Sequence, residues 1–343
     1  MIGILGGYGE VGRSAASILA GRQIRIGGRD ASRGFAVDVT DEQSLDRFIA
    51  GCELIVNCTG PSHLLSATVA KAVLRAGVDL VDAGGDETLR TSLDDEARVA
   101  GRTVMLAAGA LPGLSGIVPR WLAADLGGLD HLTAYFAVAD RFTKAAAEDY
   151  LDGVLGMGNE PLAAWRDGGA VPEALHRRHD VMLPYLATPV SAFPFLDDES
   201  RQVARDLDLS SGAWYSVIEG ERLLAALDRA RGTSRAEAVE DVCRSAALDL
   251  AGRTGRTTFV VQGRGGSRTR TAVVRGPGIS VLTGAVAGLA ATAVLEGNVL
   301  PGAWSAATAL DPVATIDRLR AVARCSVLPA SIEDLTVVEE GVL

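Results

Sequence analysis

A glycine-rich stretch near the first residue most constrains how this chain can fold. The sequence "MIGILGGYGEVGRSAA" sets Gly7, Gly9 and Gly12 in the spacing G-x-G-x-x-G, after an apolar run and before residues at helical spacing. In a strand–turn–helix unit of this kind, the first glycine makes the tight turn, the second admits a pyrophosphate, and the third lets helix and strand pack closely. We therefore expect this loop to bind a dinucleotide at the helix N-terminus, through Gly7, Tyr8, Gly9, Glu10, Val11 and Gly12.

The pattern that follows divides the chain into three predicted parts. Over residues 1–127, short apolar runs alternate with helical patterns, which is typical of βαβ units and predicts a doubly wound parallel sheet (a Rossmann domain). Residues 128–301 predict an α+β substrate and dimerisation domain on an antiparallel sheet, with a hairpin turning at "GRGGS" (263–267). Residues 302–343 are expected to return to the first domain.

Composition narrows the function class. The net charge of −10 argues against a nucleic-acid-binding surface, and no apolar run reaches the ~20 residues that a membrane span needs. Cys52, Cys58, Cys243 and Cys325 show no metal-binding spacing, so we expect reduced thiols and no metal. The immediate start of a strand leaves no room for a signal peptide, which predicts a cytoplasmic protein. A small-residue helix over 282–295 is compatible with a homodimer or with burial inside one chain.

The end of the second predicted strand bears on the choice of cofactor. An NAD-binding domain usually has an acidic residue there to bind the ribose 2′-hydroxyl, whereas this strand ends in Gly28-Arg29-Asp30. The planar guanidinium of Arg29 suits a 2′-phosphate, with Ser32 and Arg33 as further donors, so we favour NADP. NAD stays open, because Asp30 could turn inward instead. Asp38 has two open roles: binding the adenine amino group, or capping the next helix.

These motifs together resemble a known family. "GGYGEVGR", "GGRD", "VNCTGP", "AVLRAGVDLVDAGGD" and "AAGALPGLSGIVPRWLA" occur in this order in saccharopine dehydrogenase-like NAD(P)-binding proteins. The resemblance covers residues 1–125 well and extends to the later hairpin and the helix after it. It implies an oxidoreductase that transfers hydride at a carbon–nitrogen bond or, less often, at a carbon–carbon double bond. It does not imply a particular substrate.

The resemblance also implies which loops face the nicotinamide. They are the loops after the fourth strand and after "TVMLAAG", with residues Cys58, Thr59, Gly60, Pro61, Gly109, Ala110, Pro112 and Gly113. Asp82, Gly84 and Gly85 would lie near the cleft. Cys58 is not expected to be a nucleophile, because it follows an apolar strand and no base is nearby in the sequence.

Hydride transfer to an imine also needs a proton donor, or a carboxylate that holds a protonated iminium. The stretch "VADRFTKAAAEDYLDG" supplies Asp140, Lys144 and Tyr150 as candidates, and His63 follows the fourth strand. Lys144 could instead be a solvated helix residue, and His63 an ordinary polar residue at a helix N-terminus.

Three functions remain open at this point. The first is an NADP-dependent oxidoreductase, of imine reductase or amino-acid dehydrogenase type, acting on a small-molecule substrate. The second is an enoyl-type reductase of lipid or polyketide metabolism. The third is a cofactor-binding protein that senses NADP(H) or acts as a scaffold without turnover. No nucleic-acid or membrane partner is expected for any of them.

Overall fold

The structure, a computed structural model, describes residues 1–155, 159–322 and 326–330. The chain divides into two compact units, one formed by Met1–Ile117 with Ser280–Ala323 and the other by Val118–Ile279 with Arg324–Leu343. The predicted boundaries, at 127 and 301, fall at other positions. Cys325 lies outside the described residues.

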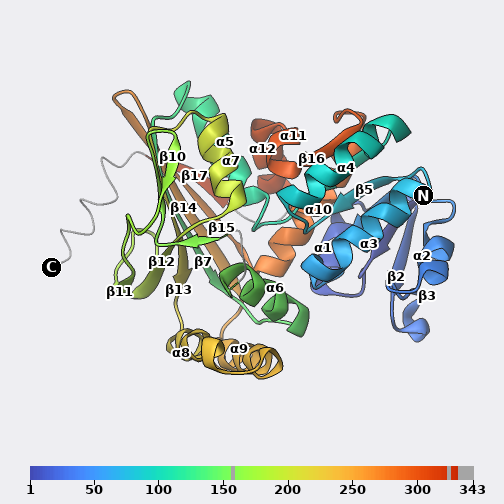
Figure 1. Ribbon diagram of the computed structural model, residues 1–343, viewed down its shortest axis with the longest axis horizontal. Helices are drawn as coiled ribbons and strands as arrows, with labels where there is room; N and C mark the ends of the chain where they lie inside the picture. The colour runs from blue at the N-terminus through green and yellow to red at the C-terminus, as the bar shows by residue number, and fades with distance from the viewer. Residues whose placement is uncertain (156–158, 323–325, 331–343) are drawn as a thin grey trace. The chain divides into compact units, whose positions relative to one another are not determined.

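The first unit is built on a seven-stranded parallel sheet (Figure 1). Its order is β16-β6-β5-β4-β1-β2-β3, and every paired strand runs parallel to its neighbour. The strands are β1 (Ile2–Leu5), β2 (Ile24–Gly28), β3 (Phe35–Ala36), β4 (Leu54–Asn57), β5 (Asp79–Asp82), β6 (Thr103–Leu106) and β16 (Gly302–Ser305). The predicted doubly wound sheet is therefore confirmed, with β16 added at one edge by a segment from far along the chain.

The helices of this unit enclose the sheet. They are α1 (Glu10–Ile18), α2 (Glu42–Ile49), α3 (Ser62–Arg75), α4 (Glu87–Ala100), α10 (Ile279–Leu295), α11 (Ala306–Ala309) and α12 (Pro312–Val322), with a 3₁₀ turn, η1 (Ala31–Arg33). Side chains of α2, α3 and α4 share one apolar core with the strands, centred on residues such as Phe48, Val69 and Leu93. The helix α5 (Leu114–Leu126) carries the chain from the first unit into the second.

The small-residue helix α10 packs against α1 within the first unit. A Cβ atom at Gly284 would overlap the carbonyl oxygen of Val11, and one at Gly288 would lie 2.6 Å from the Cβ of Ile18. The Ser14 hydroxyl also donates to the carbonyl of Val281, at 2.7 Å. Because this burial occurs inside one chain, the small residues of α10 give no support to a homodimer.

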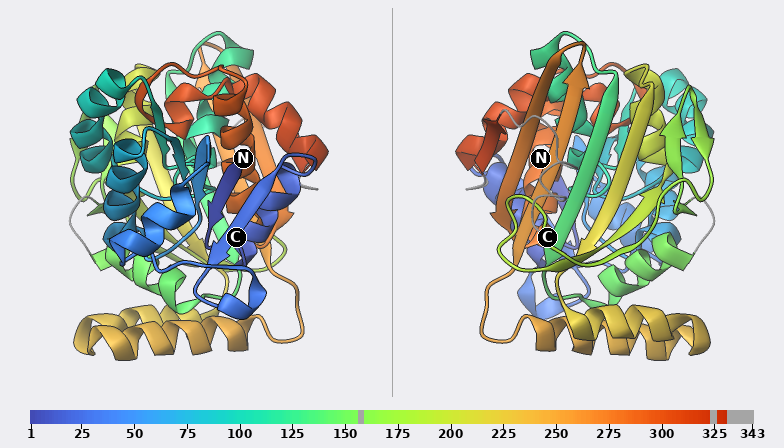
Figure 2. Two further views of the ribbon diagram at one scale, coloured as in Figure 1. Left: turned by 90° about the vertical axis from the view of Figure 1, so that its right-hand side faces the viewer. Right: turned by 90° about the vertical axis from the view of Figure 1, so that its left-hand side faces the viewer.

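The second unit holds a ten-stranded sheet, several of whose long strands lie side by side in the right-hand view of Figure 2. The strands are β7 (His131–Ala139), β8 (Glu160–Pro161), β9 (Ala164–Arg166), β10 (Gly169–Val171), β11 (Arg178–Val181), β12 (Val190–Leu196), β13 (Ser211–Ile218), β14 (Arg256–Gly265), β15 (Arg268–Pro277) and β17 (Ser326–Ala330). The helices are α6 (Lys144–Leu155), α7 (Asp198–Asp206), α8 (Glu221–Arg229) and α9 (Arg235–Asp249), with a 3₁₀ turn, η2 (Ala230–Gly232).

This second sheet differs in one respect from the antiparallel sheet that the sequence predicts. The predicted hairpin is confirmed: β14 and β15 pair antiparallel and turn at Gly266, whose φ is +58°. The central strands β7 and β13, however, pair in parallel from Ser211 with His131 to Val217 with Ala137. The sheet is therefore mixed, because this parallel pair lies among antiparallel ones.

The contact between α10 and α1 generates a prediction about stability. We expect Gly284→Ala to lower the free energy of unfolding by about 1–3 kcal/mol, because the atom in the way is backbone and cannot rotate aside. Urea denaturation followed by circular dichroism measures this change. Gly153→Ala in α6 is the control, since a Cβ there meets nothing within 4 Å and should be neutral or slightly stabilising. Equal effects of the two substitutions would contradict the proposed packing.

Candidate cofactor site

The loops that follow β1 and β4 meet where the strand order of the first sheet reverses. β1 lies between β2 and β4, so the chain proceeds to one side after β1 and later to the other. Gly6 has a φ of +69°, and a Cβ atom on it would lie 2.6 Å from the carbonyl oxygen of Cys58. The two loops are therefore in direct backbone contact at the carboxyl edge, the place where open parallel sheets bind ligands. The sequence motif did not single out Gly6, although the doubled glycine was the available signal.

The glycine loop leaves the start of α1 open. Gly9 is the N-cap residue, with φ −73° and ψ 171°, and it provides no side-chain cap. A Cβ atom at Gly12 would lie 2.5 Å from the Cα of Gly7, so only glycine lets the helix begin this close to the strand. The first N–H groups of a helix lack partners within it, and here no side chain of the N-cap residue takes their place. The residues from Gly7 to Gly12 thus form a cradle that fits a pyrophosphate.

The turn after β2 contains the residues predicted to choose between NADP and NAD. Arg29 and Asp30 are both exposed. Asp30 is the N-cap of η1, where one carboxylate oxygen accepts hydrogen bonds from the Ser32 hydroxyl at 2.6 Å and from the Ser32 amide at 3.0 Å. These bonds to Ser32, followed by the charge of Arg33, lower the pKa of Asp30. The Ser32 hydroxyl is therefore directed at Asp30.

Asp38 stabilises its own turn. Its carboxylate accepts from the Thr40 hydroxyl at 2.7 Å and from the Thr40 amide at 2.9 Å. These bonds, and more weakly the charge of Arg29, lower the pKa of Asp38. The N-cap of α2 is Asp41, so the alternative role expected for Asp38, capping this helix, is wrong.

A buried pair of polar side chains joins the ends of β4 and β5. Asn57 and Asp82 are 0% and 1% exposed, and the Asn57 amide donates to one Asp82 oxygen at 2.8 Å. The other Asp82 oxygen accepts from the Gly84 amide at 2.9 Å. Asn57 in turn accepts from the Thr59 hydroxyl at 2.6 Å and from the Thr59 amide at 3.1 Å. Sequence reasoning did not single out Asn57, because its role depends on a partner 25 residues away.

This pair also connects to the loop after β6. The Ala108 amide donates to the Asp82 carbonyl at 2.9 Å, and the Ala107 amide donates to the Gly84 carbonyl at 2.7 Å. Gly113, with φ +124°, has no space for a Cβ atom against the backbone of Ala107 and Gly109. The Gly109 amide closes the loop on the Pro112 carbonyl at 3.1 Å. The loops predicted to face the nicotinamide are therefore held together at one edge of the sheet.

The loop after β4 joins α3 at Gly60, Pro61 and His63, the remaining predicted residues of this region. Gly60 and Pro61 are joined by a cis peptide bond, and Pro61 is the N-cap of α3 without a side-chain cap. His63 is exposed in the first turn of this helix.

Burial raises the pKa of the Cys58 thiol to about 12, with a further contribution from the charge of Asp82. At neutral pH this thiol is protonated, which agrees with the expectation that Cys58 is not a nucleophile.

Two of the candidates in the second unit lie in unlike environments. The Lys144 side chain is 76% exposed, and its ammonium group pairs with Glu240 at 3.3 Å, as expected of a solvated helix residue. Tyr150 is hydrogen-bonded to Ser216, and burial raises the pKa of its hydroxyl. Its ring lies 5.4 Å from that of Phe142. Nothing in these contacts gives Lys144 the enclosed position that a proton-donating lysine needs.

Asp140 is the candidate whose carboxylate has a buried oxygen without a hydrogen-bond partner among the described residues. One carboxylate oxygen accepts from the Arg141 amide at 2.8 Å, whereas Oδ2 is buried without a hydrogen-bond partner among the described residues. Arg256, which lies opposite Ala139 in the register of β14 with β7, pairs with Glu219. Gly255 and Gly278 flank the carboxylate, and a Cβ atom at Gly255 would lie 2.6 Å from Oδ1. A buried carboxylate oxygen without a partner is costly and needs an explanation.

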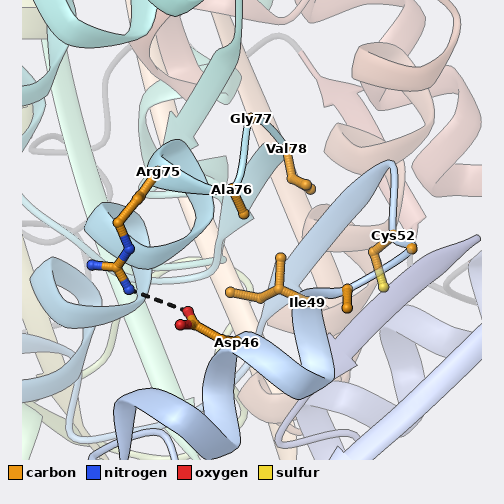
Figure 3. Close-up of a pocket in the computed structure, with 9 residues that line it drawn as sticks. Asp46, Ile49, Cys52, Arg75, Ala76, Gly77 and Val78 are labelled. Atoms are coloured by element: carbon orange, nitrogen blue, oxygen red, sulfur yellow. Dashed lines mark hydrogen bonds and ion pairs between the residues drawn. The ribbon is translucent and has the colours of Figure 1, made fainter.

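A separate hollow of about 420 Å³ lies in the first unit at the opposite edge of the sheet (Figure 3). Cys52 precedes β4 and Val78 precedes β5, so these residues lie at the amino ends of the strands. The Arg75 guanidinium closes one side of the hollow through an ion pair with Asp46 at 3.2 Å. It contains none of the predicted site residues.

Two absences hold for the part of the chain that the structure describes. No helix there is long and apolar enough to cross a membrane. Nor does that part hold a group of three or more His, Cys, Asp or Glu side chains placed to bind a metal ion.

Comparisons with known proteins identify the fold. Saccharopine dehydrogenase (L-Glu forming) from Saccharomyces cerevisiae, in its apo form, superposes with a TM-score of 0.67 at 14% identity, over 96% of this chain and 99% of that chain. The predicted resemblance is thereby confirmed at the level of the fold. DAP dehydrogenase of C. glutamicum, in complex with DAP, has a TM-score of 0.48 at 15% identity, over 93% of this chain and 98% of that one.

Sequence comparison gives a shorter match. L-aspartate dehydrogenase 1 of Bordetella parapertussis is 39% identical over 69 residues, which are 19% of this chain and 26% of that protein. The match thus spans only about a quarter of that relative's length. No protein-family model matches the chain.

The buried pair of Asn57 and Asp82 generates a prediction about stability. Both Asp82 oxygens accept hydrogen bonds from donors, and the amide nitrogen of an asparagine cannot replace either of them. We therefore expect Asp82→Asn to lower the free energy of unfolding by about 1–3 kcal/mol, measured by urea denaturation. The control is Asp86→Asn, because Asp86 is the exposed N-cap of α4 and asparagine caps equally well. A neutral Asp82→Asn would show that this network does not hold the loops.

Proposed function

We propose that this protein is an oxidoreductase that binds NADP and transfers hydride at a carbon–nitrogen bond of a small amine or imine. The observation that carries the proposal is the glycine loop at the carboxyl edge of the first sheet. There Gly6 packs against Cys58 and Gly12 against Gly7 too closely for any Cβ atom. The fold shared with a saccharopine dehydrogenase and the short likeness to an L-aspartate dehydrogenase support an amino-acid-type substrate.

The residues of the first unit would bind and orient the cofactor. The open N-terminus of α1 would take the pyrophosphate, with the glycines keeping side chains out of its way. The loops joined through Asn57 and Asp82 would provide a fixed surface for the nicotinamide half. A bound nicotinamide supplies the hydride or accepts it, so the protein's part is orientation, water exclusion and the placement of charge.

The preference for NADP over NAD rests on the turn after β2. An acid that binds the ribose 2′-hydroxyl needs a carboxylate directed at it, whereas Asp30 is occupied in capping η1 through Ser32. Arg29, exposed at the strand tip, is free of that constraint and carries the charge that a 2′-phosphate requires.

Asp140 is the residue we propose to hold the reacting nitrogen. An ammonium or iminium nitrogen carries a positive charge, and the Asp140 carboxylate, whose buried Oδ2 has no hydrogen-bond partner among the described residues, would stabilise it. Glycines at 255 and 278 keep neighbouring side chains away from this carboxylate. Lys144, which is solvated, and Tyr150, which is bonded to Ser216, are less suited to the role.

Cofactor binding is tested by fluorescence titration of the purified protein with NADPH and NADH in parallel. We expect NADPH to bind more tightly, and Arg29→Ala to weaken NADPH about 10-fold while NADH changes less than about two-fold, because only NADPH carries the 2′-phosphate. Arg47→Ala, an exposed arginine in α2, controls for loss of general positive charge. Tighter binding of NADH would assign the ribose site to Asp30, and no binding of either would refute the oxidoreductase.

Catalysis is tested with Asp140→Asn, assayed for NADP⁺ reduction with a panel of amino acids. We expect kcat/KM to fall about 100-fold or more, with NADPH affinity unchanged, because the variant loses the charge that holds the amine. Asp152→Asn, at an exposed position of α6, is the matched control. Full activity of Asp140→Asn would exclude this role. Tight NADPH binding without turnover of any amine would favour the non-catalytic sensor.

A further inference from the structure

Tyr8 joins the glycine loop to the turn after β2. Its hydroxyl donates a hydrogen bond to the carbonyl oxygen of Arg33 at 2.6 Å and lies 3.4 Å from the carbonyl of Ile26. Tyr8 comes from the loop between β1 and α1, whereas Arg33 ends η1, 25 residues further along the chain. One side chain therefore connects the predicted pyrophosphate loop to the turn that carries Arg29.

The Tyr8 ring fits a slot made by two glycines. A Cβ atom at Gly28 would lie 2.6 Å from the ring carbon Cδ2, and one at Gly34 would overlap the hydroxyl. Gly34 also has a φ of +149°, which disfavours any other residue there. The ring thus occupies space that would otherwise hold side chains of the turn.

The Tyr8 ring also contacts the charged group of Arg33. The guanidinium carbon of Arg33 lies 4.8 Å from the centroid of the Tyr8 ring, which is the geometry of a cation–π contact. Tyr8 therefore contacts Arg33 twice, through its ring and through its hydroxyl. Because an exposed arginine otherwise samples many rotamers, the ring contact limits where its charge can lie, while the hydrogen bond holds its backbone.

Two arginines thus remain as donors for an anion at this turn. The Ser32 hydroxyl is directed at Asp30, so it does not add a donor. Arg33 lies close enough to Asp30, and Arg29 close enough to Asp38, for each charge to lower the pKa of the neighbouring acid. A phosphate dianion at such a turn would be bound more strongly with both guanidinium groups held near it.

We propose that Tyr8 is a positioning residue that sets the choice of cofactor, by fixing Arg33 as the second guanidinium, beside Arg29, for the 2′-phosphate. This inference rests on the proposed binding of a dinucleotide. It separates two roles in the site: the glycines select for a pyrophosphate of either cofactor, and Tyr8 selects for the phosphate that only NADP carries. The turn is then already ordered in the folded protein, so binding of the cofactor does not carry the entropy cost of ordering it.

The experiment compares four ligands on four proteins and one control variant by isothermal titration calorimetry. The ligands are NADPH, NADH, 2′,5′-ADP and 5′-AMP, of which the last two isolate the contribution of the 2′-phosphate. The proteins are the wild type, Tyr8→Phe, Arg33→Ala and the double variant. Phenylalanine keeps the ring and its contact with Arg33 but removes the hydrogen bond to the Arg33 carbonyl. Arg33→Ala removes the charge and leaves the loop connection, and Arg47→Ala is the control for charge.

The expected result is a selective loss. Tyr8→Phe should weaken NADPH and 2′,5′-ADP about five-fold and Arg33→Ala about 10-fold, while NADH and 5′-AMP change less than about two-fold. The double variant should be no weaker than Arg33→Ala alone, because Tyr8 acts through Arg33. Equal weakening of NADPH and NADH by Tyr8→Phe, or no weakening of either, would overturn the inference.

The same data separate this inference from the proposed function. A wild type that binds neither dinucleotide would refute both. A wild type that prefers NADPH, with Tyr8→Phe and Arg33→Ala keeping that preference unchanged, would refute only the role of Tyr8. Thermal unfolding of each variant shows that it is folded, and the ratio of NADPH to NADH affinity is a readout that general destabilisation would not move.

Discussion

The close approach of two backbone segments at the carboxyl edge of the parallel sheet is the constraint on which the candidate site depends. Gly6 lies against the carbonyl of Cys58, and Gly12 lies against Gly7, at separations that no Cβ atom would tolerate. These contacts bring the start of α1 next to the loop after β4. Because the helix begins there without a side-chain cap, its N-terminal amides stay available to an anion.

A second constraint is the buried pair of Asn57 and Asp82, which converts separate loops into one surface. Asn57 also accepts from Thr59 in the loop after β4, and Asp82 accepts from Gly84 in the loop after β5. The backbone of Asp82 and Gly84 continues the connection to the loop after β6. A polar network inside a protein is costly unless its members are satisfied. In this pair the hydrogen bonds satisfy both side chains and fix the loops in place. A surface that is already ordered binds a ligand without a further entropy cost for ordering it.

The second unit shows why candidates of similar appearance in the sequence differ in the structure. Asp140, Lys144 and Tyr150 come from one short stretch, but β7 ends just before Asp140 and α6 begins at Lys144. The end of the strand buries the carboxylate between glycines, whereas the first turn of the helix turns the lysine to solvent. Helical geometry then brings Tyr150 to Ser216 of β13. Spacing along the chain carried none of this information.

The fold of the first unit was predictable from the sequence, because glycine spacing and apolar periodicity act over a few residues and express local backbone geometry. The hairpin of β14 and β15 was predictable for the same reason. The sequence also indicated the cradle from Gly7 to Gly12 and the exposed Arg29.

The parallel pairing of β7 with β13, the burial of α10 against α1, and the pairing of Asn57 with Asp82 were decided only by the tertiary structure. The same holds for Tyr8 against Arg33 and for the unpartnered oxygen of Asp140. The physical reason is that each of these joins residues 25 or more positions apart, or depends on which neighbours are missing, and no local pattern records either.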